Sequence, residues 1–223
     1  MSQENFDELY KIVLIGDSGV GKSNILSRYI HDEFSIDTKT TVGVEFGSKI
    51  ITISNKKLKI QLWDTAGQEK FKAVTNIYYK GAKGALIIYD ITRRETFENI
   101  NKWILELKNN EDNVIIILIG NKSDLEEFRE ISQEEAFQKA KDLNCAFLET
   151  SAMQAVNIEK CFFMLVQEIY KKFNNVILDD KNRINDKDKV IVLNNNSNNE
   201  EEENNGKSKK KKKKKFKIKF KKC

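Results

Sequence analysis

Proline is absent from the 223-residue chain, and histidine and cysteine are scarce, with one and three residues. The lone histidine, His31, argues against a Ser/His/Asp catalytic triad and against a histidine-based zinc site. The cysteines show no metal-ligand spacing and cannot form a disulfide framework, which favours a reducing compartment. We expect Cys145 and Cys161, which lie in apolar segments, to be buried as small hydrophobic side chains.

Segments that direct a chain into or across a membrane are also missing. No apolar run approaches the roughly 18 residues that span a bilayer. The N-terminal stretch MSQENFDELY has no apolar signal core, and Ser2 stands where N-myristoylation requires glycine. We therefore expect a protein that is made in the cytosol and remains on that side of the membrane.

Positive charge is concentrated at one end of the chain. The chain has 39 basic and 34 acidic side chains, and 12 of the basic ones are lysines within residues 207–223. The rest of the chain is therefore acidic, with 27 basic against 34 acidic side chains. Such segregation predicts a basic arm for a polyanionic partner rather than a basic binding face.

Between residues 10 and 173, short apolar runs alternate with longer segments of helical period. Near-continuous hydrophobicity in so short a run is typical of strands buried on both faces of a parallel sheet. One further run, residues 46–54, meets the segment 56–64 across Asn55 like the arms of a hairpin, which predicts one antiparallel strand. We expect an α/β three-layer sandwich with a six-stranded, mostly parallel sheet and a site at the strand C-termini. The apolar runs are 10–16, 59–64, 84–91, 113–120 and 145–150.

The periodicity stops near Phe173. The following segment is rich in asparagine and charge and cannot bury enough apolar surface to offset its ordering entropy. We expect a short extension at residues 1–7, a folded domain at residues 8–173 and a disordered tail with a polybasic end at residues 174–223.

The stretch GDSGVGKS matches G-x-x-x-x-G-K-[ST], follows a predicted strand and opens a predicted helix. Its glycines allow backbone N–H groups to face phosphates, Lys22 would bridge the β- and γ-phosphates, and the Ser23 hydroxyl would ligate Mg²⁺. The alternative is a glycine-rich turn that matches by chance. The expected phosphate-site residues are Gly16, Asp17, Ser18, Gly19, Val20, Gly21, Lys22, Ser23 and Asn24.

A second motif, WDTAGQE, ends a predicted strand with Asp64. Asp64 can hold Mg²⁺ through a water molecule, the Gly67 N–H can contact the γ-phosphate, and Gln68 can orient an attacking water. The alternative for Gln68 is a solvated residue at the start of a helix.

The third and fourth motifs, NKSD and ETSAM, each follow a buried strand and point to a guanine base. The Asp124 carboxylate can accept hydrogen bonds from the N1–H and 2-amino group of guanine, a donor pair that adenine lacks. Asn121 would support its loop, Lys122 would lie over the base, and the Ala152 N–H would face the guanine O6. Ser151 and Met153 flank Ala152 and complete the expected base-binding residues.

These residues resemble the Ras superfamily of small GTPases, and within it the Rab family. The strings TVGVEF, KFKAVT, YYKGA and LIIYDIT are similar to those that separate Rabs from other branches, and the resemblance spans residues 8–173. It implies that Thr41 is a further Mg²⁺ ligand, beside Ser23 and Asp64, and that Phe34 packs on the base. GKSNILSRY and NKSDL look most like the recycling-endosome subfamily of Rabs.

The resemblance implies a GTP-binding and GTP-hydrolysing switch that regulates vesicle trafficking, with GTP or GDP and Mg²⁺ bound. Gln68, Lys22 and Thr41 are the expected catalytic residues. Because the predicted switch loops contain no obvious arginine finger, we expect slow intrinsic hydrolysis and dependence on an activating protein. The alternatives are a guanine-nucleotide-binding scaffold without turnover and a P-loop kinase, although a kinase should lack NKSD.

The same resemblance implies several protein partners: an exchange factor, a GTPase-activating protein, a GDP-dissociation inhibitor or escort protein, and effectors. Effectors would contact Phe46, Trp63 and Tyr78, for which the alternative role is ordinary core packing. We expect a monomer that binds no nucleic acid.

The lysine-rich tail favours an anionic membrane as its partner, because each lysine near such a surface contributes about 1 kcal/mol. A lipid on the terminal Cys223 would supply the second signal that stable anchoring requires. The chain departs here from Rabs, which usually end in two cysteines. Geranylgeranylation is the expected modification, and the alternatives are palmitoylation, no lipid, or a nuclear-localisation or nucleic-acid-binding arm. The expected location is the cytoplasm and the cytoplasmic face of endosomal or Golgi-derived membranes.

Overall fold

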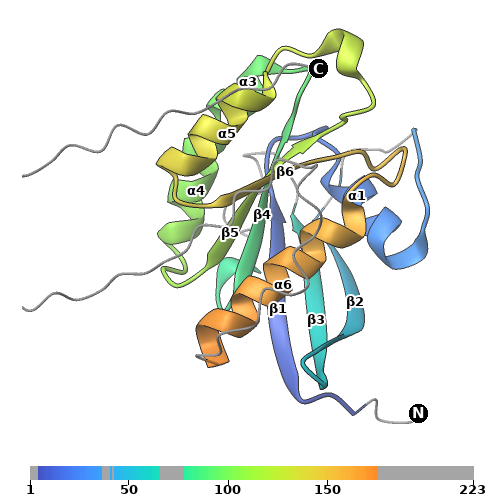
Figure 1. Ribbon diagram of the computed structural model, residues 1–223, viewed down its shortest axis with the longest axis vertical. Coiled ribbons are helices and arrows are strands. Elements are labelled where there is room, and N and C mark those ends of the chain that lie inside the picture. Colours follow the sequence, from blue (N-terminus) through green and yellow to red (C-terminus); the bar gives the residue numbers. More distant parts are fainter. Residues whose placement is uncertain (1–4, 37–40, 42, 66–77, 175–223) are drawn as a thin grey trace, which may run out of the picture. The chain divides into compact units, whose positions relative to one another are not determined.

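A six-stranded sheet forms the centre of the computed structural model, which describes residues 5–36, 41, 43–65 and 78–174 (Figure 1). The strand order is β2-β3-β1-β4-β5-β6, and all neighbours are parallel except β2 and β3. The predicted mostly parallel α/β sandwich is confirmed. The strands are β1 (Glu8–Ile15), β2 (Val44–Ile53), β3 (Lys56–Thr65), β4 (Gly84–Asp90), β5 (Ile115–Asn121) and β6 (Ala146–Thr150).

The antiparallel pair is a tight hairpin, as the sequence predicts. Ile53 pairs with Lys56, and the two residues between them, Ser54 and Asn55, have φ angles of 50° and 63°. Two successive residues with positive φ suit a two-residue hairpin turn whose twist matches that of the strands.

Helices cover both faces of the sheet (Figure 1). Successive strand side chains alternate between two apolar cores, so that Leu14 packs with α1 and α6 whereas Val13 packs with α4 and α5. Both faces of the central strands are therefore buried, which explains why their sequences are almost continuously apolar. The helices are α1 (Lys22–His31), α3 (Arg94–Glu98), α4 (Ile100–Lys108), the short 3₁₀ helix η2 (Glu126–Phe128), α5 (Gln133–Asp142) and α6 (Ile158–Asn174).

One predicted helix differs from the structure. The periodicity predicts a single helix over residues 96–110, whereas the structure has α3 and α4, which meet at Asn99. The backbone N–H of Asn99 still donates to the Glu95 carbonyl at 3.0 Å, and its own carbonyl accepts from the Trp103 N–H at 3.2 Å, so the two helices follow each other without an intervening loop. The Asn99 side chain leaves this junction to contact the loop after β1, as described below.

The carboxyl ends of the parallel strands meet at one edge of the sheet, where the loops after them carry the predicted motifs. In the register of the sheet, Asp90 at the end of β4 lies beside Asn121 at the end of β5, which lies beside Thr150 at the end of β6. Such an edge is where open α/β sheets bind ligands. Within the described residues, no helix combines the length and the apolar character needed to cross a membrane.

Candidate nucleotide-binding site

A pocket of about 330 Å³ lies at this edge of the sheet. Its walls come from the loop after β1, the start of α1, the segment after α1 and the loops after β5 and β6. Thirteen of the predicted site residues line it, which brings the separate motifs together: Ser18, Gly19, Gly21, Lys22, Ser23, Asn24, Phe34, Thr41, Asn121, Lys122, Asp124, Ala152 and Met153.

Five other predicted residues are described but do not line the pocket: Gly16, Asp17, Val20, Asp64 and Ser151. Gly67 and Gln68 lie outside the described residues, as does the tail from residue 175 onward.

The loop between β1 and α1 curls through three glycines with positive φ, and Gly21, at φ 96°, is the N-cap of α1. A Cβ atom on Gly21 would stand 2.4 Å from Nδ2 of Asn121, which donates to the Val20 carbonyl at 2.8 Å. Only glycine allows this approach. The loop after β5 thereby braces the loop after β1.

Lys22 is buried at the base of the pocket, with a relative exposure of 6%. Its Nζ atom donates to the carbonyls of Gly16 at 3.0 Å and Asp17 at 2.9 Å. Burial lowers the pKa of Lys22, although the negative charges of Asp64 and Asp17 act in the opposite direction. A buried ammonium group that the loop's own carbonyls hold in place is suited to receive an anionic ligand.

Ser23, Thr41 and Asp64 form a cluster of oxygen atoms beside Lys22. Ser23 Oγ donates to Asp64 Oδ2 at 2.5 Å and lies 2.8 Å from Thr41 Oγ1. Asp64 is fully buried, and its other oxygen, Oδ1, accepts no hydrogen bond from the described residues. Burial is the largest cause of the raised pKa of Asp64, which is about 6.

The loops after β5 and β6 are joined by several hydrogen bonds. The Ser151 hydroxyl donates to Asp124 Oδ1 at 2.5 Å, and the Ser123 N–H donates to the Thr150 carbonyl at 3.0 Å. Arg28 of α1 donates from Nε to the Ala152 carbonyl at 3.0 Å. Ser151 therefore fixes the orientation of the Asp124 carboxylate from behind the pocket, although Ser151 does not line it.

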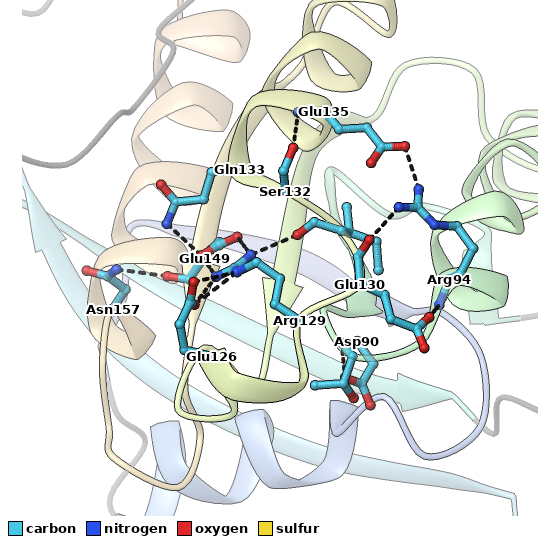
Figure 2. A network of polar contacts seen from close by, with 12 residues as sticks. Asp90, Arg94, Glu126, Arg129, Glu130, Ser132, Gln133, Glu135, Glu149 and Asn157 are labelled. Atoms are coloured by element: carbon cyan, nitrogen blue, oxygen red, sulfur yellow. Dashed lines mark hydrogen bonds and ion pairs between the residues drawn. The ribbon is translucent and has the colours of Figure 1, made fainter.

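A network of charged side chains lies behind these two loops (Figure 2). Arg129, which follows η2, donates through Nη1 and Nη2 to the two carboxylate oxygens of Glu149 at 2.7 and 2.9 Å. Gln133 donates to the same carboxylate, and Asn157 donates to the Glu149 backbone carbonyl. Hydrogen bonding to Glu149 is the largest cause of the raised pKa of Arg129.

The Asp17 side chain points away from the pocket, although the sequence predicts it as a binding residue. Its two carboxylate oxygens accept hydrogen bonds from Asn99 Nδ2 at 2.8 Å and Trp103 Nε1 at 2.7 Å. Asp17 thus ties the loop after β1 to the junction of α3 and α4. Its backbone carbonyl still accepts from Lys22.

Sequence reasoning missed Asp90, Arg93 and Arg129 as parts of the site, and it gave no role to Glu149, the first residue of ETSAM. Asp90 carries one available signal, since it is the only charged residue in the apolar run 84–91. A charged side chain at the end of a buried strand needs a partner. No comparable signal marks Arg129, because its partner Glu149 is 20 residues away.

Phe46, Trp63 and Tyr78, the expected effector residues, form one aromatic cluster. The ring centroids are 5.0 Å apart for Phe46 and Trp63, and 5.4 Å apart for Trp63 and Tyr78. Phe46 is 51% exposed, whereas Trp63 and Tyr78 are half-buried. Lys11 Nζ lies 5.0 Å from the Trp63 ring centroid, a cation–π distance. Part of the cluster therefore packs on the core, and part is available to a partner.

Comparisons with known proteins agree with this architecture. The Ras family model matches residues 11–171. Ras-related protein Rab2BV of Beta vulgaris is 52% identical over 166 residues, which cover 74% of this chain and 78% of that protein. The GTP-binding protein ypt3 of Schizosaccharomyces pombe is 49% identical over 178 residues, which cover 79% of this chain and 83% of that protein. Ras-related protein Rab-11A of Dictyostelium discoideum is 52% identical over 170 residues, which cover 76% of this chain and 79% of that protein.

The chain therefore belongs to the Ras family of GTPases, and specifically to its Rab proteins. The family predicted from the motifs is confirmed. As a Rab protein, the chain is a GTP-binding switch of vesicle traffic.

Proposed function

We propose that the chain binds GTP or GDP with Mg²⁺ in the pocket described above, hydrolyses GTP and acts at a membrane to which its tail attaches it. The observation that carries this proposal is a single pocket that unites Lys22 with Asp124. A buried cation at one end suits phosphates, and an oriented carboxylate at the other suits the donor edge of guanine. Residues 8–173 would form the GTPase domain, and residues 174–223 would form the tail.

The phosphate end would use the curled loop after β1 and the N-terminus of α1. Backbone N–H groups from Gly19 to Ser23 would face the phosphates, and Lys22 would contact the β- and γ-phosphates. The loop is held in its curled form by Asn121. This brace supports a site whose shape exists before the ligand binds, which reduces the ordering cost of binding.

The base end would use Asp124, with its carboxylate already oriented by Ser151. Lys122 and Phe34 line the pocket and would pack on the base, and the Ala152 N–H would face the guanine O6. Adenine offers the half-buried Asp124 carboxylate no such pair of donors, so ATP should bind on the order of 10⁴-fold more weakly than GTP.

The residues present fit a magnesium ion. Ser23, Thr41 and Asp64 offer hydroxyl and carboxylate oxygens, which are the ligands that Mg²⁺ prefers, and Asp64 Oδ1 is buried without a hydrogen bond from the described residues. When bound, Mg²⁺ would neutralise charge on the β- and γ-phosphates. Ser23 and Thr41 would ligate it directly, and Asp64 would hold it through water.

Hydrolysis would depend on Gln68 as the residue that orients the attacking water and on the Gly67 N–H as a γ-phosphate contact. With GTP bound, Thr41 and Gly67 would order two loops that relax after the γ-phosphate leaves. Intrinsic turnover should be slow, because an arginine from an activating protein would complete the site.

Single-turnover assays with the full chain test the reaction. GTP with Mg²⁺ should give phosphate release, whereas ATP with Mg²⁺, or GTP with excess chelator, should give none. Gln68→Ala should bind GTP normally and slow its hydrolysis. GTP binding without any phosphate release would replace this proposal with the scaffold alternative, and equal turnover of ATP would overturn the assignment of Asp124.

The partners that we propose are an exchange factor, a GTPase-activating protein, a GDP-dissociation inhibitor or escort protein, and effectors. Phe46, Trp63 and Tyr78 would form the effector contact, since Phe46 is exposed and the three rings are contiguous. Phe46→Ala should weaken effector capture from a lysate of the source cells and leave GTP hydrolysis unchanged.

The lysine-rich tail would bind the anionic cytoplasmic face of endosomal or Golgi-derived membranes, together with a lipid on Cys223. Similarity to Rab-11A and the RABA proteins supports a place among recycling-endosome Rabs. Intact-mass measurement of the protein from its own cells tests the lipid, and an unmodified terminus would exclude it. A tagged chain ending at Phe173 should keep nucleotide binding and lose membrane delivery.

A further inference from the structure

We propose that Arg93 is a positioning residue for nucleotide binding, which holds the phosphate loop at Ser18 and connects that loop, through Asp90, to Lys122 of the base-binding loop. This inference rests on the proposed function of the pocket. It assigns a role to a residue outside all four sequence motifs.

Arg93 reaches the phosphate loop from the segment between β4 and α3. Its Nη2 atom donates to the Ser18 carbonyl at 2.9 Å. A Cβ atom built on Gly19 would lie 3.7 Å from Nη2 and 3.9 Å from Nη1, so the guanidinium covers the turn at Ser18 and Gly19. Both of these loop residues line the pocket.

The backbone of Arg93 is itself fixed. Its N–H donates to the Asp90 carbonyl at 3.0 Å, and its own carbonyl accepts from the Thr96 hydroxyl at 2.8 Å. The guanidinium therefore approaches the loop from an anchored base. A contact from a fixed backbone can restrain the loop, whereas a contact from a mobile side chain would only follow it.

Asp90 links Arg93 to the base-binding loop. This carboxylate is completely buried, and its Oδ2 atom lies 2.7 Å from Lys122 Nζ and 3.4 Å from Arg93 Nε. Its Oδ1 atom accepts hydrogen bonds from the N–H and the hydroxyl of Thr92. A buried carboxylate requires compensating charge, and Arg93 and Lys122 supply it together. Arg93 and Lys122 are thereby held by one shared oxygen.

The charge of Arg93 also acts on Lys22. Burial is the main reason for the lowered pKa of Lys22, and the positive charge of Arg93 contributes in the same direction. Both cations thus belong to the electrostatic environment that a phosphate chain would enter. Loss of Arg93 would remove a restraint on the loop and a positive charge from its neighbourhood at the same time.

The adjacent residue, Arg94, provides a matched control. Its guanidinium donates to Glu135 and to the Glu130 carbonyl, both at 2.5 Å, and it lies at the far end of the network from Glu149 (Figure 2). Arg94 therefore has the same charge and neighbouring sequence position but makes none of these contacts with the phosphate loop.

The test compares Arg93→Gln, Arg93→Lys and Arg94→Gln in the full chain with Mg²⁺ present. The dissociation rates of fluorescent GDP and IDP are measured by displacement with excess unlabelled nucleotide. We expect Arg93→Gln to release GDP roughly three- to tenfold faster than the unsubstituted protein, the effect of losing one ordinary hydrogen bond from a partly exposed side chain. Arg93→Lys should show partial recovery because it keeps the charge without the forked geometry. Arg94→Gln should stay within about twofold of the unsubstituted protein.

Two readouts separate positioning from general stability. Inosine lacks the 2-amino group of guanine, so the ratio of IDP to GDP release reports on the base contacts. This ratio should not change in Arg93→Gln, because Lys122 keeps its own contact with Asp90 and Ser151 still orients Asp124, which would face the 2-amino group. Arg93→Gln should lower the urea midpoint more than Arg94→Gln, because it leaves Lys122 alone to compensate the buried Asp90 carboxylate. Arg93→Lys keeps that charge, so it should recover the urea midpoint while GDP release stays faster than in the unsubstituted protein. The inference would be overturned if Arg93→Gln released GDP at the rate of the unsubstituted protein, or if Arg94→Gln released GDP as fast as Arg93→Gln. In either case the proposed function would stand. Failure of the unsubstituted protein to bind GDP would overturn the proposed function with it.

Discussion

The ion pair between Arg129 and Glu149 offers a quantitative test of how the base-binding loops are held. Arg129 follows the loop that contains Asp124, and Glu149 precedes the loop that contains Ser151. Figure 2 shows the guanidinium of Arg129 between the carboxylates of Glu126 and Glu149. Removal of Arg129 would break one connection between these loops and leave the hydrogen bond from Ser151 to Asp124 in place.

The expected cost follows from burial and geometry. The Arg129 and Glu149 side chains are 13% and 9% exposed, and two parallel hydrogen bonds join them. Breaking a buried pair by removing one partner costs about 3–5 kcal/mol. Because Gln133 would still donate to Glu149 and some water can reach the site, we expect Arg129→Met to lower the free energy of unfolding by about 2–3 kcal/mol. The bond from Arg129 to the exposed Glu126 should add little.

A double-mutant cycle in urea measures this coupling. Arg129→Met, Glu149→Leu and the double variant are unfolded at one fixed concentration of GDP and Mg²⁺, and the ligand contribution is subtracted with each variant's dissociation constant. Lys56→Met is the control, since Lys56 and Asp7 are 50% and 42% exposed and their charged atoms are 3.9 Å apart. That change should cost less than about 0.5 kcal/mol.

The double variant should be more stable than the sum of the single effects predicts, by about 1.5 kcal/mol or more, because neither partner is then left buried alone. Additive single effects, or a loss below about 1 kcal/mol in Arg129→Met, would show that the pair does not hold the loops together.

Three further predictions concern the phosphate loop and the cores. Gly21→Ala should weaken GDP binding by about 100-fold or more in calorimetry, because a Cβ atom at φ 96° would stand 2.4 Å from Asn121; near-normal affinity would contradict the brace. Trp103→Phe should lower the free energy of unfolding in urea by about 1.5–3 kcal/mol through loss of its 2.7 Å hydrogen bond to Asp17. Burial raises the pKa of Cys145 to about 11, so at pH 8 the thiol should stay protonated and resist iodoacetamide in the native protein. Peptide mapping should find Cys145 alkylated only in urea, and alkylation without denaturant would contradict its burial.

The burial of the central strands on both faces could be predicted from the sequence, because such strands are almost continuously apolar. Val13 and Leu14 belong to opposite cores, so neither position of the alternation can be polar. The hairpin could also be predicted, since Asn55 tolerates the positive φ that a two-residue turn requires. The break between α3 and α4 at Asn99 could not be predicted, because the residues on both sides of it keep the apolar period of a helix.

Motif spacing predicted residues that the structure brings into one pocket, but it did not predict the direction of each side chain. Asp17 is an example, since its position within the phosphate motif suggests a ligand contact. Its side chain instead pairs with Trp103, which lies 86 residues further along the chain. A partner at that distance is determined by how α4 packs on the sheet, which no local pattern records. The same limit applies to Arg93 and Ser18, which are 75 residues apart.

The phosphate loop depends on these long-range partners for one physical reason. Three glycines with positive φ give the phosphate loop its curl, and glycine loses more conformational freedom on folding than any other residue. Within the motif, Lys22 restrains this loop through the Gly16 and Asp17 carbonyls, and further restraints come from elsewhere in the chain. Asn121, Arg93 and Trp103 contact it from three different elements, at two backbone carbonyls and at the Asp17 carboxylate. The rigidity that a phosphate chain would meet thus comes from the surrounding fold, so substitutions well outside the motif should alter nucleotide affinity as strongly as many within it.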